Sequence, residues 1–116
     1  MLNKQIPKKL RNEMERDTYY QRCCVTGRLA VIEKVEWHHN FQWEGQRLNE
    51  KWAILPIAKY VHDQARTKKV KDYLDYIMLN RASESTLKKY SKGENLIEKR
   101  DRLNKYYDNE KNIPLL

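Results

Sequence analysis

Three histidines are the residues of this chain best suited to chemistry, and two of them are adjacent. His38 and His39 stand in the stretch "EWHHNFQWEG", and His62 follows 23 residues after His39. A neutral imidazole binds divalent metal ions, and it titrates near neutral pH, so it can also take a proton from water. Neighbouring side chains on a strand point to opposite faces. If this stretch is a strand, we expect one histidine to join His62 on a metal ion and the other to face a substrate.

The segments around the histidines predict two strands and a helix. Residues 29–37, "LAVIEKVEW", are rich in apolar and β-branched residues and favour a strand that leads into His38. A loop punctuated by Gly45 should follow, and then the short apolar run "WAILPI", in which Pro56 ends strand pairing. The turn "CCVTGR" precedes the first strand, with Gly27 in a left-handed conformation. The expected order is strand 29–37, loop 40–51, strand 52–57 and helix 57–66.

Helices are expected on both sides of this unit. Pro7 suits a first helical turn, and Leu10 and Met14 share one face of a helix over residues 8–21. Downstream, the apolar stripes Val70, Leu74, Ile77, Met78 and Leu96, Leu103, Tyr107 predict two helices. Ser83 or Ser85 should cap a helix between them, and Gly93 should interrupt it. Residues 108–116 look like a frayed tail.

Charge and composition limit the class of protein. The 116 residues carry a net charge of +8, which favours a polyanionic partner, most often nucleic acid. No apolar run approaches the roughly 20 residues that span a bilayer, and residues 1–17 lack the apolar core of a signal peptide, so a cytoplasmic location and no membrane partner are expected. Cys23 and Cys24 are adjacent and lack the second cysteine pair that would complete a zinc site, so we expect reduced thiols and no structural zinc.

The stretch from Arg22 to Ala65 resembles the HNH endonucleases, a branch of the ββα-metal or His-Me finger nucleases. The matching text is "VEWHHNFQWEGQRLNEKWAILPIAKYVHD", with "CCVTG" similar to the knuckle that often precedes it. The resemblance implies an α+β fold in which a ββα-metal finger is flanked by helices. Together with the length of the chain and the predicted helices, it gives a single HNH-like nuclease domain over residues 1–116, with the finger at about 22–66 and helical flanks at 7–21 and 68–107. The flanking helices themselves are not part of the resemblance.

The resemblance also implies roles for the histidines and for an asparagine. His38 and His62 would bind one divalent cation, Mg²⁺ or Mn²⁺, and His39 would be the general base for hydrolysis of DNA. Asn49 matches the asparagine that fixes the loop and orients the base. Its spacing from the last histidine is longer than usual, so Asn40 or the Trp52–Ala53 region are alternatives for that place.

Further residues are candidates for contacts with phosphate or metal. Arg47, or alternatively Arg66, would steady the scissile phosphate, and Asp63 would join the metal or orient an imidazole. Because the second cysteine pair is absent, a hydrophobic core must hold the finger, with Trp37, Phe41, Trp43 and Trp52 as its candidates. Lys68, Lys69 and Lys71 would contact the DNA backbone, and the helical flanks could pair two copies into a homodimer.

Two other classes of protein also fit the sequence. One is a basic DNA-binding protein without catalysis, in which the helices supply the charged surface. The other is a small interaction or inhibitor protein whose helices bind a partner, and it predicts neither metal nor DNA binding. The small size of the chain is typical of a phage-type nuclease, which would act in a bacterial or phage-infected cell.

Overall fold

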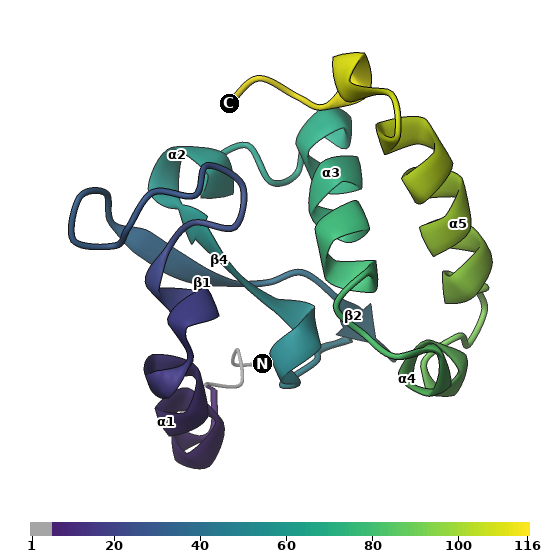
Figure 1. The fold of residues 1–116 in the computed structure, drawn as a ribbon. Helices are drawn as coiled ribbons and strands as arrows, with labels where there is room; N and C mark the ends of the chain where they lie inside the picture. The colour runs from purple at the N-terminus through teal and green to yellow at the C-terminus, as the bar shows by residue number, and fades with distance from the viewer. Residues whose placement is uncertain (1–5) are drawn as a thin grey trace.

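A computed structural model describes residues 6–116, and residues 1–5 of the predicted domain lie outside the described part. The fold is α+β, with a small antiparallel sheet between helices from the two ends of the chain, as predicted (Figure 1). The helices are α1 Lys8–Arg16, α2 Lys59–His62, α3 Lys68–Leu79, α4 Glu84–Lys89 and α5 Leu96–Tyr107, with 3₁₀ turns η1 Thr18–Gln21, η2 Lys51–Ala53 and η3 Glu110–Asn112. The strands are β1 Val35–His39, β2 Gln42–Trp43, β3 Gln46–Arg47 and β4 Ile54–Ala58.

Strands β1 and β4 form the sheet that carries the adjacent histidines. They pair antiparallel from Val35 opposite Ala58 to His39 opposite Ile54. All five residues of β4 are buried, whereas those of β1 are half-buried. Helix α2 follows β4 directly, so His62 at its end returns toward β1. Two strands followed by a helix were predicted, and this order is confirmed, although the helix is only one turn long.

Pro56 lies inside β4, opposite Trp37, so the prediction that it ends strand pairing is wrong. Its carbonyl oxygen accepts a hydrogen bond of 2.8 Å from the amide of Cys24, which lies on the edge of β4 away from β1. The amide and carbonyl of one strand residue face the same edge. The N–H that proline lacks would therefore point to this outer edge, and no hydrogen bond to β1 is lost.

The first strand is shorter than predicted, and the loop after it is more ordered. Residues 29–34 form turns, and β1 begins at Val35. The apolar composition of this segment is misleading because the side chains of Val31 and Ile32 are exposed. The predicted loop contains the hairpin β2–β3, whose two turn residues, Glu44 and Gly45, have φ of 53° and 77°. Such a turn favours glycine because it needs positive φ at both positions.

The N-terminal helix and α2 are also shorter than the sequence suggested. Helix α1 ends at Arg16, because Asp17 is extended and its carboxylate accepts a hydrogen bond from the amide of Tyr19, starting η1. Such local side-chain bonds compete with helix continuation. Helix α2 is a single turn that ends at His62. The predicted helices 8–21 and 57–66 are therefore each broken into a helix and a following turn, and residues 57 and 58 belong to β4 instead.

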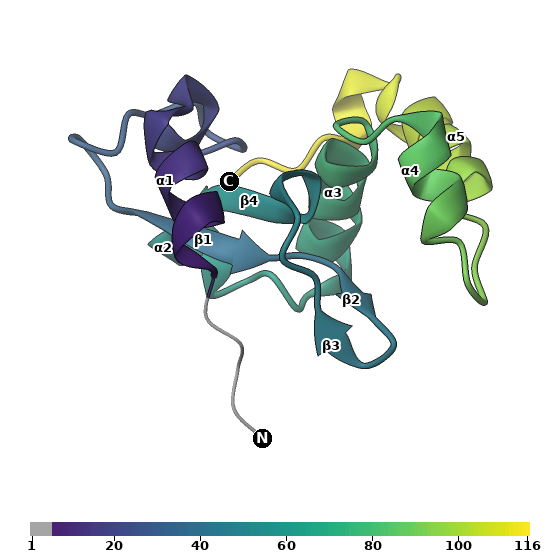
Figure 2. The ribbon, with the colours of Figure 1, turned by 90° about the horizontal axis from the view of Figure 1, so that it is seen from below.

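The C-terminal helices pack beside the sheet and supply about half of the main hydrophobic core. Helices α3 and α5 lie side by side in both Figure 1 and Figure 2. The predicted apolar stripes are confirmed, since Val70, Leu74 and Leu103 are buried in the same cluster as β4. Ser83 caps α4 by accepting a hydrogen bond from the amide of Thr86. None of the helices in residues 6–116 is long and apolar enough to cross a bilayer.

Both ends of the described chain are tied to apolar side chains. Met14 packs with Tyr20 and Ile54 in a second, smaller cluster, to which Trp37 contributes. At the other end, Ile113 and Leu116 pack against the main cluster, and Pro114 is buried. The prediction of a frayed tail is therefore wrong, because the tail has apolar positions to dock. The aromatic residues expected to hold the finger do pack in these clusters: Trp37, Phe41, Trp43 and Trp52.

Candidate active site

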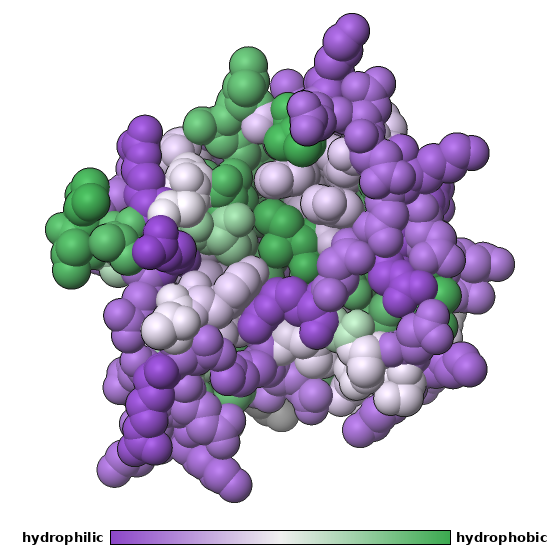
Figure 3. Space-filling model, in the orientation of Figure 1, coloured by the Kyte–Doolittle hydropathy of each residue, from purple (hydrophilic) through white to green (hydrophobic). Residues whose placement is uncertain are grey.

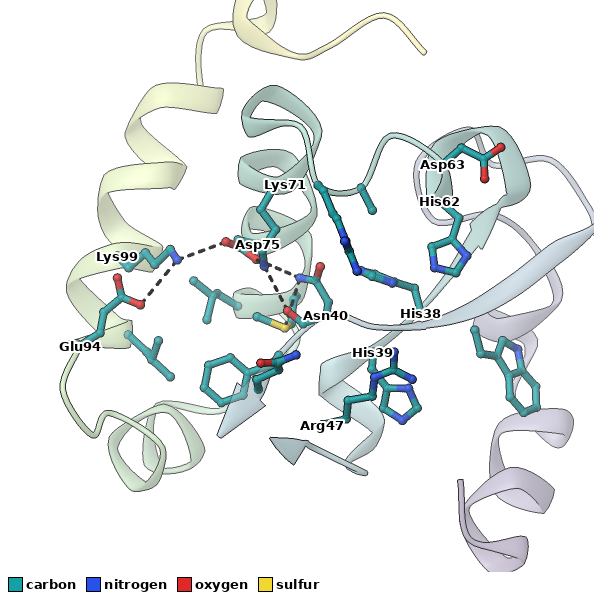
Figure 4. Close-up of a pocket in the computed structure, with 18 residues that line it drawn as sticks. His38, His39, Asn40, Arg47, His62, Asp63, Lys71, Asp75, Glu94 and Lys99 are labelled. Atoms are coloured by element: carbon teal, nitrogen blue, oxygen red, sulfur yellow. Dashed lines mark hydrogen bonds and ion pairs between the residues drawn. The ribbon is translucent and has the colours of Figure 1, made fainter. Parts of the chain in front are cut away.

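The two adjacent histidines point to opposite sides of β1, as strand alternation predicts. His38 faces α2, and its ring centroid lies 4.9 Å from that of His62, with an angle of 61° between the ring planes. Figure 4 shows His38 and His62 on one side of the strand and His39 on the other. The pair forms because β1 and β4 are in register and α2 begins where β4 ends. Two imidazoles from segments far apart in sequence thus meet at one point.

Glu36 sets the orientation of the His62 ring. Its carboxylate oxygen Oε1 lies 2.8 Å from Nδ1 of His62, and both side chains are about one-third exposed. Glu36 and His38 are two residues apart on β1, so their side chains leave the strand on the same face. A carboxylate only accepts, so it favours the proton of a neutral ring on Nδ1 and leaves the lone pair on Nε2. This is the usual arrangement behind a metal-binding histidine.

His38 is neutral at physiological pH. Burial, followed by the nearby His62, lowers the pKa of His38 to about 4 from its ordinary 6.5. Burial acts in this direction because a charged imidazole loses its hydration. Only a neutral imidazole has a free lone pair for a metal ion. The His38 side chain is therefore in the form that a ligand needs.

His39 contacts Asn49 on the opposite face of β1. Nε2 of His39 lies 2.8 Å from the amide oxygen Oδ1 of Asn49, which comes from the segment between β3 and η2. An amide oxygen accepts, so the proton of the neutral ring sits on Nε2, and Nδ1 carries the lone pair. The residues named as base and orienting asparagine are brought together, while the roles themselves stay predictions. Asn40, an alternative for the asparagine, is instead buried and contacts α3.

All three histidines line one pocket of about 690 Å³. The two arginines predicted to bind phosphate line it too. Arg47 enters from β3, and Arg66 enters from the turn that follows α2. Asp63 also lines the pocket, but its carboxylate pairs with Lys59 at 3.2 Å, and both side chains are about two-thirds exposed. The structure thus brings the two arginines to the histidines and leaves Asp63 in a solvated ion pair.

A buried carboxylate, Asp75 of α3, organises the other end of the pocket. Its side chain is 4% exposed, and it accepts hydrogen bonds from the Asn40 amide at 3.0 Å and from the Lys71 ammonium at 2.5 Å. Lys99 of α5 pairs with its second oxygen at 3.2 Å. Although burial opposes the charged form, the attraction to Asp75 raises the pKa of Lys99. Figure 4 shows this network next to the histidines.

The network ties β1 to α3 and α5 directly behind the histidines. Asn40 is the residue after His39, and its backbone carbonyl accepts a second hydrogen bond, of 3.1 Å, from Lys71. The amide oxygen of Asn40 is buried without a hydrogen-bond partner among residues 6–116. Because Lys71 is committed to Asp75 and Asn40, it belongs to the pocket wall more than to an outer charged surface. Lys71 was predicted to contact a DNA backbone together with Lys68 and Lys69, and its bonds to Asp75 and Asn40 set it apart from these two lysines.

Lys68 and Lys69 lie at the exposed start of α3. The ammonium of Lys68 pairs with Asp72 at 2.8 Å, and the lysine side chain is 88% exposed. Lys69 is also exposed. A surface pair of this kind holds its partners loosely, because water screens the attraction. Both side chains can therefore turn toward another anion, but they start outside the pocket that the histidines border.

Two histidines are the protein ligands that the site offers to a metal ion. Within residues 6–116, no three or more His, Cys, Asp or Glu side chains gather closely enough to hold one. The pair could supply two nitrogen ligands to a cation that takes its remaining ligands from water and substrate phosphate. Imidazole nitrogens suit transition metals better than Mg²⁺, which prefers oxygen ligands. Comparisons with family models, with curated proteins and with solved structures found no match to this chain.

Sequence reasoning missed the contacts that support the histidines. Asp75 had a visible signal, since it stands beside Leu74 on the apolar face of α3, where an acidic residue needs a buried partner. Lys71 precedes it by four residues, which places the two side chains together on a helix. Glu36 also had a signal, because it precedes His38 by two residues on a predicted strand and therefore shares a face with it. Lys99 had none, because its contact depends on how α5 packs.

Proposed function

We propose that this chain is a metal-dependent DNA endonuclease of the HNH, or ββα-metal, kind. The observation that carries the proposal is the division of the two adjacent histidines between separate partners. His38 meets His62 at 4.9 Å between ring centroids, while His39 meets Asn49 at 2.8 Å on the other side of β1. A protein that merely binds DNA has no need for two adjacent imidazoles held by separate partners on opposite faces of a strand. The +8 charge supports a polyanionic substrate.

In the proposed reaction His39 is the general base. Nδ1 of His39 takes a proton from a water molecule, whose oxygen attacks the phosphorus as the opposite phosphorus–oxygen bond breaks, and the leaving oxygen is protonated from solvent. Asn49 holds the base through Nε2, so that Nδ1 stays the acceptor. Arg47 and Arg66 line the pocket and would bind the phosphate oxygens through their guanidinium groups. Removing a general base of this type costs about 10² to 10⁴ in rate.

His38 and His62 would hold the divalent cation in this proposal. When bound, such a cation neutralises charge on the phosphate and on the leaving oxygen. The lone pair of His38 is available because burial keeps the ring neutral, and Glu36 aims that of His62. With two nitrogen ligands, Mn²⁺ fits the pair better than Mg²⁺, although both remain candidates. Asp63 could become a further ligand of the cation only after its carboxylate had left the ion pair with Lys59.

The test is cleavage of supercoiled, linear and branched DNA with Mg²⁺, Mn²⁺ or EDTA side by side. We expect cleavage that requires a divalent ion and that His39→Ala abolishes. His39→Ala should still bind DNA, because the variant keeps every arginine and lysine. Trp37→Phe, next to His38 on the same strand, serves as a control for general disturbance of β1 and should retain cleavage.

The other two classes of protein predict different results in the same assay. A non-catalytic DNA-binding protein would shift DNA without cutting it in any of these ions. An interaction or inhibitor protein would neither cut nor shift DNA at moderate salt. Either result, obtained with a folded wild-type protein, would refute the proposed nuclease.

A further inference from the structure

Two large apolar side chains project into solvent from the turn before β1. Val31 is 90% exposed and Ile32 is 74% exposed, and we call this pair the apolar tip. In Figures 1 and 2 the loop that carries it is the outermost part of the molecule on the side of β1, and Figure 3 shows an apolar projection at that place. Single exposed apolar residues are common, but two neighbours at the end of a projection mark a contact site.

The loop under the apolar tip is held in shape by backbone hydrogen bonds. The amide of Ala30 donates to the carbonyl of Gln21 at 2.8 Å, and the amide of Ile32 donates to the carbonyl of Leu29 at 3.0 Å. Leu29 also forms an isolated bridge with Arg22. The tip is therefore presented in a fixed turn, so little chain entropy is lost when it inserts into a partner.

Positive side chains flank the apolar tip in the chain. Arg22, Arg28 and Lys34 lie on either side of it and are exposed. The two acidic neighbours are both paired, Glu33 with Arg28 at 3.3 Å and Glu36 with His62 at 2.8 Å. The side chain of Glu33 is 22% exposed and that of Arg28 62%, so the cation is the more accessible partner. An apolar point inside a cationic rim is complementary to a polyanion with an apolar interior. Duplex DNA has this character, with phosphates outside and stacked bases inside.

A short stretch of chain connects the apolar tip to the proposed catalytic histidines. Ile32 precedes His38 by six residues, and a chain spans at most about 3.6 Å per residue, so the two lie within roughly 22 Å. Duplex DNA rises about 3.4 Å per base pair, which makes that distance about six base-pair steps. A duplex held at the histidines is thus long enough to reach the tip.

We propose that the apolar tip inserts between base pairs of the DNA substrate, within about six steps of the cleaved phosphate. This inference rests on the proposed function for its choice of partner. Proteins that insert aliphatic wedges unstack a base step and gain contacts along the bent DNA. A second copy of the chain is disfavoured, because two aliphatic side chains expose far less than the roughly 800 Å² per partner of a stable interface.

The test uses wild-type protein, Val31→Ser/Ile32→Ser and the matched control Leu115→Ser, in which an equally exposed aliphatic residue outside the tip is replaced. Each protein is titrated, in EDTA, into duplexes that wild type binds and that carry 2-aminopurine at successive positions. This base brightens when it is unstacked. Because the replaced side chains are exposed, all three proteins should fold alike, as circular dichroism will verify.

We expect wild type and Leu115→Ser to brighten one or two adjacent positions. Val31→Ser/Ile32→Ser should brighten none and should bind with a Kd about tenfold higher, since the apolar contact is lost. The proposal is overturned if wild type binds without brightening any position, or if the double variant brightens like wild type. It is also overturned if the tip proves necessary for binding anionic lipid vesicles or for self-association, while no base is unstacked.

Cleavage of the same duplexes in Mn²⁺ separates this inference from the proposed function. A wild-type protein that cuts DNA without unstacking it refutes only the inserted tip. A protein that unstacks DNA through Val31 and Ile32 and never cuts it refutes only the nuclease.

Discussion

The buried ring of His38 should make the stability of the metal-free protein depend on pH between about 6.5 and 4. Burial lowers the pKa of His38 to about 4 in the folded protein, whereas the unfolded chain keeps the ordinary value of 6.5. In this window the unfolded chain binds a proton that the folded protein does not, so the free energy of unfolding falls as the pH falls. The loss begins near pH 6.5 and levels off below about 4.

The size of the effect follows from the shift in pKa. Each unit corresponds to 1.36 kcal/mol, so His38 removes at most about 3 to 4 kcal/mol of the free energy of unfolding across the window. Urea denaturation in EDTA at pH 7 and pH 4.5 would measure it, with His38→Gln as the matched protein that lacks the titrating ring. We expect wild type to lose about 2 to 3 kcal/mol more than His38→Gln. Equal losses in the two proteins, or an NMR titration of His38 centred near 6.5, would refute the reasoning.

Three further outcomes follow from the contacts around the pocket. Asn49→Ala should slow single-turnover cleavage about 10- to 100-fold without loss of DNA binding, as is typical when an orienting partner is removed; a wild-type rate would contradict its role. Asp75→Ala should lower the free energy of unfolding by about 1 to 3 kcal/mol, because it leaves the buried amide of Asn40 without its acceptor and removes the carboxylate that pairs with Lys71 and Lys99. Asp72→Ala on the same helix, measured by the same urea titration, should cost less than about 1 kcal/mol. Lys69→Gln should reduce the slope of log K against log salt concentration by about 1 if Lys69 neutralises a phosphate, and an unchanged slope would assign it to solubility.

The parts of the fold that the sequence predicted are those set by local pattern. Strand alternation placed His38 and His39 on opposite faces, and the apolar stripe of α3 identified its buried side. The end of α1 was missed because the carboxylate of Asp17 competes with the helix for backbone amides. Pro56 was misread because its place in a strand depends on which edge is paired, and a single sequence does not contain that information.

The sequence predicted which histidines lie together in the candidate site, and it did not predict the residues that support them. Types and spacing identified the three histidines, and the resemblance added Asn49. The buried network around Asp75 depends on contacts between residues 31 and 35 positions apart, and helix packing sets such contacts. The exposure of Val31 and Ile32 could not be predicted either. Both are residue types that favour strands, yet they lie on a projecting turn.

The most direct test of the divided histidines compares His38→Ala with His39→Ala in two assays. Calorimetry with Mn²⁺ measures metal binding, and cleavage of supercoiled DNA measures catalysis. We expect both variants to lose cleavage, with His39→Ala slower than wild type by about 10² to 10⁴. We expect His39→Ala to bind Mn²⁺ like wild type and His38→Ala to lose that binding. A wild-type cleavage rate in His39→Ala, or loss of Mn²⁺ from His39→Ala, would contradict the assignment of base and ligand to opposite faces of β1.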